Sequence, residues 1–347
     1  MTAPQGKLGK AAKGLIAFQK TRLLQPGETQ TVILEFKVSS MASYDDLGKV
    51  AKSAYVLEAG EYRFFVGTSV RDGSYIDYTY TVKEDTVTEQ LSARLVPTSL
   101  KERMTADGTM EPLPQGTPND PDYTPLSPMN EISKYGGEMP AVRAVERIAR
   151  RSRDRFEMLD FNKVAEGALS LDDFIAGLSD DEIMHLLGGQ PNTGVANTWG
   201  FGNLPEYNLP SAMTADGPAG LRIKPECGVC TMAFPCATLL SCTWDPDITY
   251  AVGCAGGEEV KENNIAMWLT PAINIHRSPL CGRNFEYYAE DPYLAATMAA
   301  GMVKGIQSQH ISASVKHFAL NDKETNRKGS DSRVSERAAR EIYLKAF

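Results

Sequence analysis

Two features are scarce in this sequence, and each scarcity excludes a class of protein. Cysteine is absent from the first 226 residues, and all six cysteines fall between Cys227 and Cys281, which excludes a disulfide framework across the whole chain. Long apolar runs are also lacking, because no stretch approaches the roughly 18 consecutive apolar residues that span a bilayer, and the start carries lysines without an apolar signal-peptide core. We therefore predict free thiols, no membrane partner and a cytoplasmic location.

Positive charge is in short supply as well. The chain has 36 lysines and arginines against 44 aspartates and glutamates, a net charge of −8. Nucleic acid is bound through a basic face that replaces phosphate counterions, so we predict no nucleic-acid partner. The net charge does not exclude neutral ligands such as sugars.

The clustered cysteines leave zinc as one alternative. Cys227 and Cys230 form a CxxC pair, and Cys236 and Cys242 complete a set of four thiols. A structural zinc site usually joins two short-spaced couples, whereas Cys236 and Cys242 lie in the apolar segment AFPCATLLSC. We expect buried thiols there, no metal and no cofactor, with a zinc-thiolate structural protein as the alternative.

Residues 1–98 have the pattern of a β-rich module. The segments TQTVILEFKVSS, SAYVLEAGEYRFFVGTS and DYTYTVKEDTVTEQLSARLV alternate in polarity and are rich in Val, Tyr, Phe and Thr. Turn signals at Pro26-Gly27 and Ala59-Gly60 separate them. The pattern predicts a β-sandwich with four or five strands, fewer than the about seven of a fibronectin-type sandwich, and so a module truncated at its start.

The rest of the chain divides into a connector and an α/β unit. Residues 99–164 contain the Pro-rich stretch EPLPQGTPNDPDYTPLSP and the helical pattern AVRAVERIARRSRDRF, which predicts an extended linker followed by a helix. Residues 165–347 begin with a helical hairpin capped at Ser170 and Ser179, and short apolar strands then alternate with helices around 245–263, 291–309 and 335–347. Such alternation implies parallel strands, and three or four of them predict the first part of a (β/α)8 TIM-type barrel.

Polar residues follow two of these strands. Asp216 lies in TADGPAGLR, where it either enters a ligand site or forms an ordinary Asx turn, and Arg222 could hold the same ligand or pair with a nearby acid. Lys316 and His317 lie in SVKHFALN, where a buried strand should end. Two polar side chains there are costly unless a partner or ligand satisfies them, although a satisfied core histidine is the alternative for His317.

The loop RSPLCGRNFEYYAEDPYL is the densest cluster. It combines Arg283 and Glu286 with the aromatic residues Phe285, Tyr287 and Tyr288, the mixture that suits a sugar with apolar faces and a polar rim. Glu286 could equally anchor Arg283, and Asp291 suits the N-terminus of the following helix. The residues alone would also allow Glu286 and Asp291 as a catalytic carboxylate pair.

Together, TADGPAGLR, FPCATLLSCTWD, LTPAINIHRSPLCGRNFEYYAEDP, SVKHFALN and SRVSERAAREIYLKAF resemble glycoside hydrolase family 3 in order and spacing, over about residues 165–347. The segments FQKTRLLQPGETQTV and LEAGEYRFFVGTS are similar to the fibronectin type III domain that accompanies many members. Its position before the barrel implies the permuted domain order, in which an α/β sandwich domain precedes residue 1.

The resemblance implies retaining hydrolysis of terminal β-D-glucosides by a nucleophile and an acid/base. By position, the substrate-binding residues are Asp216, Arg283, Lys316 and His317, with Arg222 in the same pocket. The family's nucleophile is an aspartate in a Ser-Asp-Trp-like motif, which we expect beyond Phe347, and the acid/base usually comes from the sandwich side. The resemblance therefore places no catalytic residue in this chain and rejects Glu286 and Asp291 for that role.

Alternatives to a β-glucosidase remain at this point. Without its catalytic carboxylates the chain could be a non-catalytic sugar-binding or vestigial fragment. Relatives with the same motifs also act on β-xylosides and N-acetyl-β-glucosaminides. The expected partners are thus a β-glucoside or oligosaccharide substrate, and the missing sandwich domain and remainder of the barrel.

Overall fold

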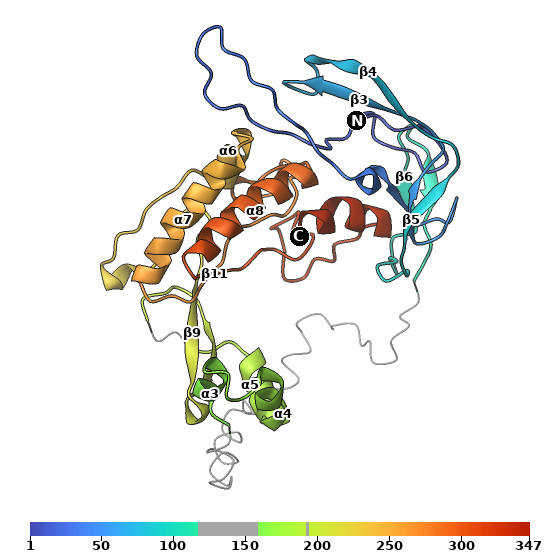
Figure 1. The fold of residues 1–347 in the computed structure, drawn as a ribbon. Helices are drawn as coiled ribbons and strands as arrows, with labels where there is room; N and C mark the ends of the chain where they lie inside the picture. The colour runs from blue at the N-terminus through green and yellow to red at the C-terminus, as the bar shows by residue number, and fades with distance from the viewer. Residues whose placement is uncertain (117–158, 192–193) are drawn as a thin grey trace.

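The first part of the protein is built from β-strands. A computed structural model describes residues 1–116, 159–191 and 194–347. The strands are β1 (Ser43–Asp45), β2 (Ala54–Leu57), β3 (Gly60–Gly67), β4 (Gly73–Val82) and β5 (Thr86–Gln90). They form two antiparallel sheets, β1-β2-β5 and β3-β4, which lie at the N-terminal end in Figure 1. Leu57 from one sheet and Tyr62 from the other share a buried cluster, as expected for a sandwich.

Two segments of this half differ from their sequence patterns. The run 29–40, predicted as a strand, is unpaired within the described part of the chain and ends in the short helix η1 (Val38–Met41). Ile33 there is 73% exposed, so its apolar side chains gain too little burial to order a strand. The predicted connector instead holds a hairpin, β6 (Glu102–Met104) and β7 (Met110–Pro112). The helix predicted at 141–156 lies outside the described residues.

The predicted helical hairpin is confirmed. Its helices are α4 (Leu171–Gly177) and α5 (Asp180–Leu187), preceded by α3 (Phe161–Ala165). The Ser170 side chain accepts a hydrogen bond from the Asp173 amide, and Ser179 forms a capping box with Glu182. Phe174 packs with Tyr207 in a small separate core beneath the hairpin.

A four-stranded sheet organises the second half. Its strands are β8 (Gly200–Leu204), β9 (Leu209–Ala215), β10 (Met267–Trp268) and β11 (Ser312–Ala313), in the order β11-β10-β9-β8. β9, β10 and β11 are parallel and in register, with Trp268 opposite both Ala215 and Ala313. The carboxyl ends of the three parallel strands therefore meet at one edge.

Helices α6 (Ala237–Cys242), α7 (Pro246–Glu262) and α8 (Pro292–Ser308) pack beside this sheet (Figure 1). Asp245 and Asp291 cap α7 and α8, and the cap at Asp291 is the one that the sequence predicts. The two long helices approach so closely that a Cβ on Gly253 would lie 2.4 Å from the Met302 carbonyl oxygen. Trp268, fully buried, fills the space between α7 and the sheet. The remaining short helices are η3 (Pro205–Tyr207), η4 (Pro225–Cys227) and η5 (Asn284–Glu286).

The last helical segment, residues 336–346, joins the two halves. It consists of α9 (Glu336–Ala338), the π-helical η6 (Ala339–Tyr343) and η7 (Leu344–Ala346), and it lies between α8 and the N-terminal strands in Figure 1. Arg337 donates to the Leu8 and Gly9 carbonyl oxygens at 2.6 and 2.9 Å, and Glu341 accepts from the Tyr44 amide at 2.5 Å. These contacts fix the β-rich half against the α/β half.

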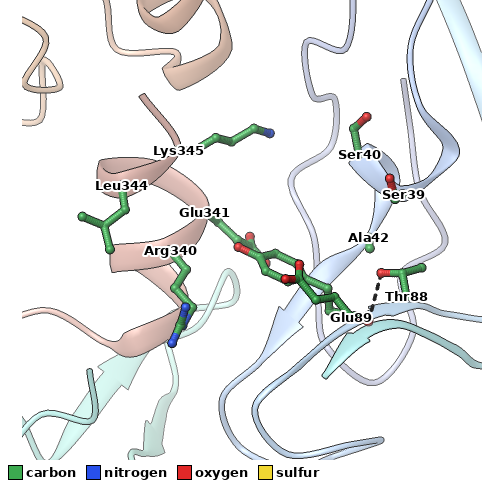
Figure 2. Close-up of a pocket in the computed structure, with 10 residues that line it drawn as sticks. Ser39, Ser40, Ala42, Thr88, Glu89, Arg340, Glu341, Leu344 and Lys345 are labelled. Carbon is green, nitrogen blue, oxygen red and sulfur yellow. Dashed lines mark hydrogen bonds between the residues drawn. The ribbon is translucent and has the colours of Figure 1, made fainter. Parts of the chain in front are cut away.

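A polar cavity of about 650 Å³ lies at this junction. Figure 2 shows the Glu341 side chain of the last helical segment extending toward Glu89 of the N-terminal half, and Ser39 also lines the cavity. None of the five predicted substrate-binding residues lines it. It is therefore separate from the site described next.

Candidate functional site

The loop after β9 places the Asp216 carboxylate at the carboxyl edge of the sheet. The Asp216 carbonyl oxygen accepts from the Arg222 amide at 2.9 Å, which closes the turn. Gly217 has φ +109°, and a Cβ there would lie 2.0 Å from the Gly220 carbonyl oxygen, so only glycine fits. The buried Trp268 indole N–H donates to the Gly217 carbonyl oxygen at 3.1 Å. The core of the sheet thereby holds the turn that carries Asp216.

Lys316 and Arg222 converge on this carboxylate. Lys316 Nζ lies 2.5 Å from Asp216 Oδ1, and Arg222 Nη1 lies 3.4 Å from Oδ2. The Lys316 side chain is only 14% exposed, whereas the Arg222 side chain is 58% exposed. The pair with Lys316 is therefore the stronger of the two, because screening by water weakens the exposed contact.

Arg283 is paired with a different carboxylate, that of Glu286. Its Nε and Nη2 both contact Glu286 Oε1, and Glu286 is buried. A second acid, Glu324, lies 3.8 Å from Arg283 Nη1. Of the two roles left open for Glu286, the structure shows the anchoring one.

His317 contacts Tyr287 and is within electrostatic reach of both ion pairs. Its Nδ1 is 3.1 Å from the Tyr287 hydroxyl, which also accepts from Asn321 Nδ2 at 2.8 Å. The charges that act most strongly on the imidazole belong to Arg283, Lys316 and Asp216. All five predicted substrate-binding residues thus gather in one neighbourhood, with Arg222 at its exposed margin.

The electrostatics keep Asp216 ionised. Burial on its own would raise the pKa of Asp216, but the hydrogen bond and the charge of Lys316 outweigh burial and lower the pKa below its usual value. The lysine and arginine charges are each balanced by a carboxylate, Asp216 and Glu286 respectively. The site can therefore present charged hydrogen-bonding groups without an isolated buried charge.

The environment of His317 predicts acid sensitivity. The pKa of His317 is lowered to about 4, chiefly by burial and then by the Arg283 and Lys316 charges, with Asp216 and Glu324 acting in the opposite direction. The unfolded chain, with the ordinary histidine pKa near 6.5, therefore binds more protons than the folded chain between about pH 4 and 6.5. Stability is full above this window and falls as the pH drops through it. Between pH 7.5 and pH 5 we expect the free energy of unfolding to fall by about 1–2 kcal/mol less in His317→Gln than in the wild type, after allowance for partial solvent screening.

Urea unfolding at pH 5 and pH 7.5, followed by tryptophan fluorescence, measures this difference. His310→Gln is the matched control, because His310 is exposed. An equal pH dependence in wild type and His317→Gln would contradict the expectation.

Two expectations about side chains in this region need correction. Of the three aromatic residues proposed to face a sugar, Tyr287 and Tyr288 are buried and only Phe285 is exposed. Cys242 is exposed and Cys236 only partly buried, so the prediction of buried thiols is wrong for Cys242. Helix α6 buries the face formed by Ala237, Leu240 and Ser241, and Cys242 falls on the opposite side.

Sequence reasoning missed Glu324, which accepts from Asn321 Nδ2 at 2.7 Å and faces Arg283. It lies in the irregular stretch NDKETNRKGSD, where no periodic pattern points to a site. Asn321 follows the strand that ends near Lys316 and His317. Its position is fixed by Asn274, whose side-chain oxygen accepts from the Asn321 amide at 3.0 Å.

Comparisons with known proteins bear on this site directly. Residues 204–347 match the profile of the Glycosyl hydrolase family 3 N terminal domain, and residues 1–70 match that of the Fibronectin type III-like domain. The parallel strands, helices α6, α7 and α8 and the site all lie in the segment that matches the glycosyl hydrolase family 3 profile, and this segment follows a fibronectin-like one.

Individual relatives agree over the whole chain. It is 59% identical to Beta-glucosidase A of Butyrivibrio fibrisolvens and 37% identical to Beta-glucosidase of Ruminococcus albus, in both cases over 100% of this chain. It spans 42% and 36% of those two proteins. A crystal structure of a beta-glucosidase from Paenibacillus barengoltzii matches 99% of this chain and 37% of its own length, with 39% identity and a TM-score of 0.81.

No helix in the described residues is both long and apolar enough to cross a membrane.

Proposed function

We propose that this chain supplies the glucose-binding part of a retaining β-glucosidase that hydrolyses terminal β-D-glucosides. The observation that carries the proposal is the convergence of Asp216, Lys316, Arg283 and His317 at the carboxyl edge of parallel strands, in a chain 59% identical to Beta-glucosidase A. Charged groups in such a site make directional hydrogen bonds to the hydroxyls of a neutral sugar. Arg222 contributes at the exposed margin.

The parallel strands β9, β10 and β11 are, in this proposal, the first parallel strands of a (β/α)8 barrel. In that fold the ligand site lies at the carboxyl ends of the strands, which is where these side chains gather. Residues 1–98 and 165–347 are the fibronectin-like and barrel domains, with 99–164 as the linker. We also propose a cytoplasmic location, because all six cysteines carry free thiols.

The catalytic carboxylates are proposed to lie elsewhere in the full-length enzyme. A retaining glycosidase needs one carboxylate as nucleophile and another as acid/base, about 5 Å apart. Asp216 is paired with Lys316, and Glu286 is paired with Arg283, so both already neutralise cations. The resemblance to glycoside hydrolase family 3 supports the rest of the proposal, that the nucleophile is an aspartate beyond Phe347 and that an α/β sandwich domain supplies the acid/base.

Two measurements on the 347-residue chain test this proposal. Saturation-transfer NMR should detect binding of glucose with a Kd of about 1 mM or weaker, because only part of the ring is enclosed. Xylose and N-acetylglucosamine should give smaller effects. A chromogenic aryl β-glucoside assay should show no turnover by this chain, whereas a protein that includes the preceding domain and the downstream aspartate should be active.

The outcomes separate the parts of the proposal. Absence of glucose binding at the highest usable concentration would overturn the assignment of the binding residues. Turnover by the chain alone that disappears in Glu286→Gln would instead show that the nucleophile is misplaced.

A further inference from the structure

The hydrogen-bond partners of His317 determine which imidazole nitrogen faces a ligand. A neutral histidine has one N–H donor and one acceptor, and the tautomer follows from what the bound nitrogen contacts. Here Nδ1 contacts the Tyr287 hydroxyl at 3.1 Å. That hydroxyl could either donate to Nδ1 or accept from it, so its other partner decides the tautomer.

Glu324 settles the direction of that bond. Asn321 Nδ2 lies 2.7 Å from Glu324 Oε1, and a carboxylate at neutral pH can only accept, so the side-chain nitrogen of Asn321 must point this way. The same nitrogen lies 2.8 Å from the Tyr287 hydroxyl and has a second hydrogen to give. The Tyr287 oxygen therefore accepts from Asn321, and its own hydrogen is left for His317.

We propose that the relay Glu324–Asn321–Tyr287 holds His317 in the tautomer with an unprotonated Nδ1 and a protonated Nε2, so that Nε2–H is a fixed donor for a sugar hydroxyl oxygen. Tyr287 is then a positioning residue that acts through His317 and does not touch the sugar. The role of Nε2–H toward sugar rests on the proposed function. The tautomer itself rests only on the contacts within the relay.

Burial and charge support a single, neutral state of the imidazole. Tyr287 is fully buried, so water does not compete for its hydroxyl. Burial lowers the pKa of His317 most and the Arg283 and Lys316 charges lower it as well, while Asp216 and Glu324 act in the opposite direction. Burial raises the pKa of Tyr287 to about 12, so the hydroxyl keeps its proton at neutral pH.

Nitrogen-15 NMR of the imidazole rings tests the relay without any sugar. The chain has only four histidines, and His317→Gln assigns the signals of His317 by their loss. At pH 7.5 we expect a pyridine-like shift for Nδ1 and a pyrrole-like shift for Nε2. The exposed His310 gives the averaged shifts of an unconstrained ring in the same spectrum.

Tyr287→Phe removes the hydroxyl while keeping the buried ring. We expect the Nδ1 shift of His317 to move from its limiting value toward that of His310, and Asn321→Ala to cause a smaller change in the same direction. Tyr288→Phe is the matched control, because this neighbouring buried tyrosine packs in the main core. It should leave the His317 shifts unchanged.

Each result decides the matter. A protonated Nδ1 in the wild type, or identical His317 shifts in the wild type and in a folded Tyr287→Phe, would overturn the relay. If Tyr287→Phe does not fold, the wild-type spectrum and Asn321→Ala carry the decision. Adding glucose should shift Nε2 in the wild type. Failure of that response alone would count against the proposed function and leave the relay standing.

Discussion

Replacing Asp216 with asparagine is expected to weaken glucose binding by about ten- to a hundredfold, because a hydrogen bond to a charged group contributes about 1.5–3 kcal/mol. The substitution keeps the shape of the side chain and one acceptor oxygen. It removes the negative charge that Lys316 Nζ faces at 2.5 Å and Arg222 faces at 3.4 Å. Two acceptor sites for sugar hydroxyls are thereby reduced to one.

The second effect of this change falls on Lys316. With its counter-charge gone, the ammonium group at 14% exposure remains partly desolvated, and the new side-chain amide can turn an N–H toward it. Lys316 must then move toward water or keep an unfavourable contact. Either response displaces a second sugar-binding group, so the loss of affinity should exceed that of Arg222→Gln, whose guanidinium is largely exposed.

Glucose titration followed by saturation-transfer NMR or tryptophan fluorescence measures the loss. Asp331→Asn is the matched control, because it makes the same chemical change at a 70% exposed aspartate that pairs with Arg333. It should change affinity less than twofold, as expected for an exposed pair. Wild-type affinity in Asp216→Asn would exclude this carboxylate from the site.

Features that depend on local chemistry were predictable from the sequence. The caps Ser170, Ser179 and Asp291 occupy the predicted positions, because a side chain that binds the next free backbone amides acts within one helical turn. The gathering of polar residues at the carboxyl ends of parallel strands was likewise predictable, since parallel register aligns those ends.

Features that depend on distant partners were not predictable. The run 29–40 alternates as a strand should, yet no described segment pairs with it. Glu324 acquires its role only when the loop after β11 folds back over Arg283. Tyr287 is an aromatic residue of the kind that packs against a sugar ring. In the structure its hydroxyl instead contacts the side chains of His317 and Asn321. For Glu324 and Tyr287 the deciding contacts join residues remote in sequence, and for the run 29–40 the partner that a strand would need is missing among the described residues.

The largest loss of stability is expected from Glu286→Gln. Glu286 is 3% exposed and neutralises Arg283, whose side chain is 20% exposed. Removing one member of a buried ion pair costs about 3–5 kcal/mol because the remaining charge is left uncompensated. The partial exposure of Arg283 and the nearby Glu324 reduce this, so we expect the free energy of unfolding to fall by about 2–4 kcal/mol.

Denaturant unfolding followed by tryptophan fluorescence measures this change in the half of the chain that contains Glu286. All three tryptophans lie in that α/β half, at Trp199, Trp244 and Trp268. Glu290→Gln is the control, since Glu290 is exposed four residues away, and it should stay within about 0.5 kcal/mol of wild type. Arg283→Lys should fall between the two, because it keeps the charge but loses the planar fork that contacts Glu286 through two nitrogens.

The same variant distinguishes an anchor from a nucleophile. If Glu286 anchors Arg283, Glu286→Gln lowers stability and glucose affinity together, because Arg283 loses its fixed orientation. If Glu286 were the nucleophile, the variant would keep glucose affinity and lose only turnover, since the nucleophile forms its bond during the reaction. An unfolding free energy equal to that of wild type would therefore contradict the anchoring role that the buried pair indicates.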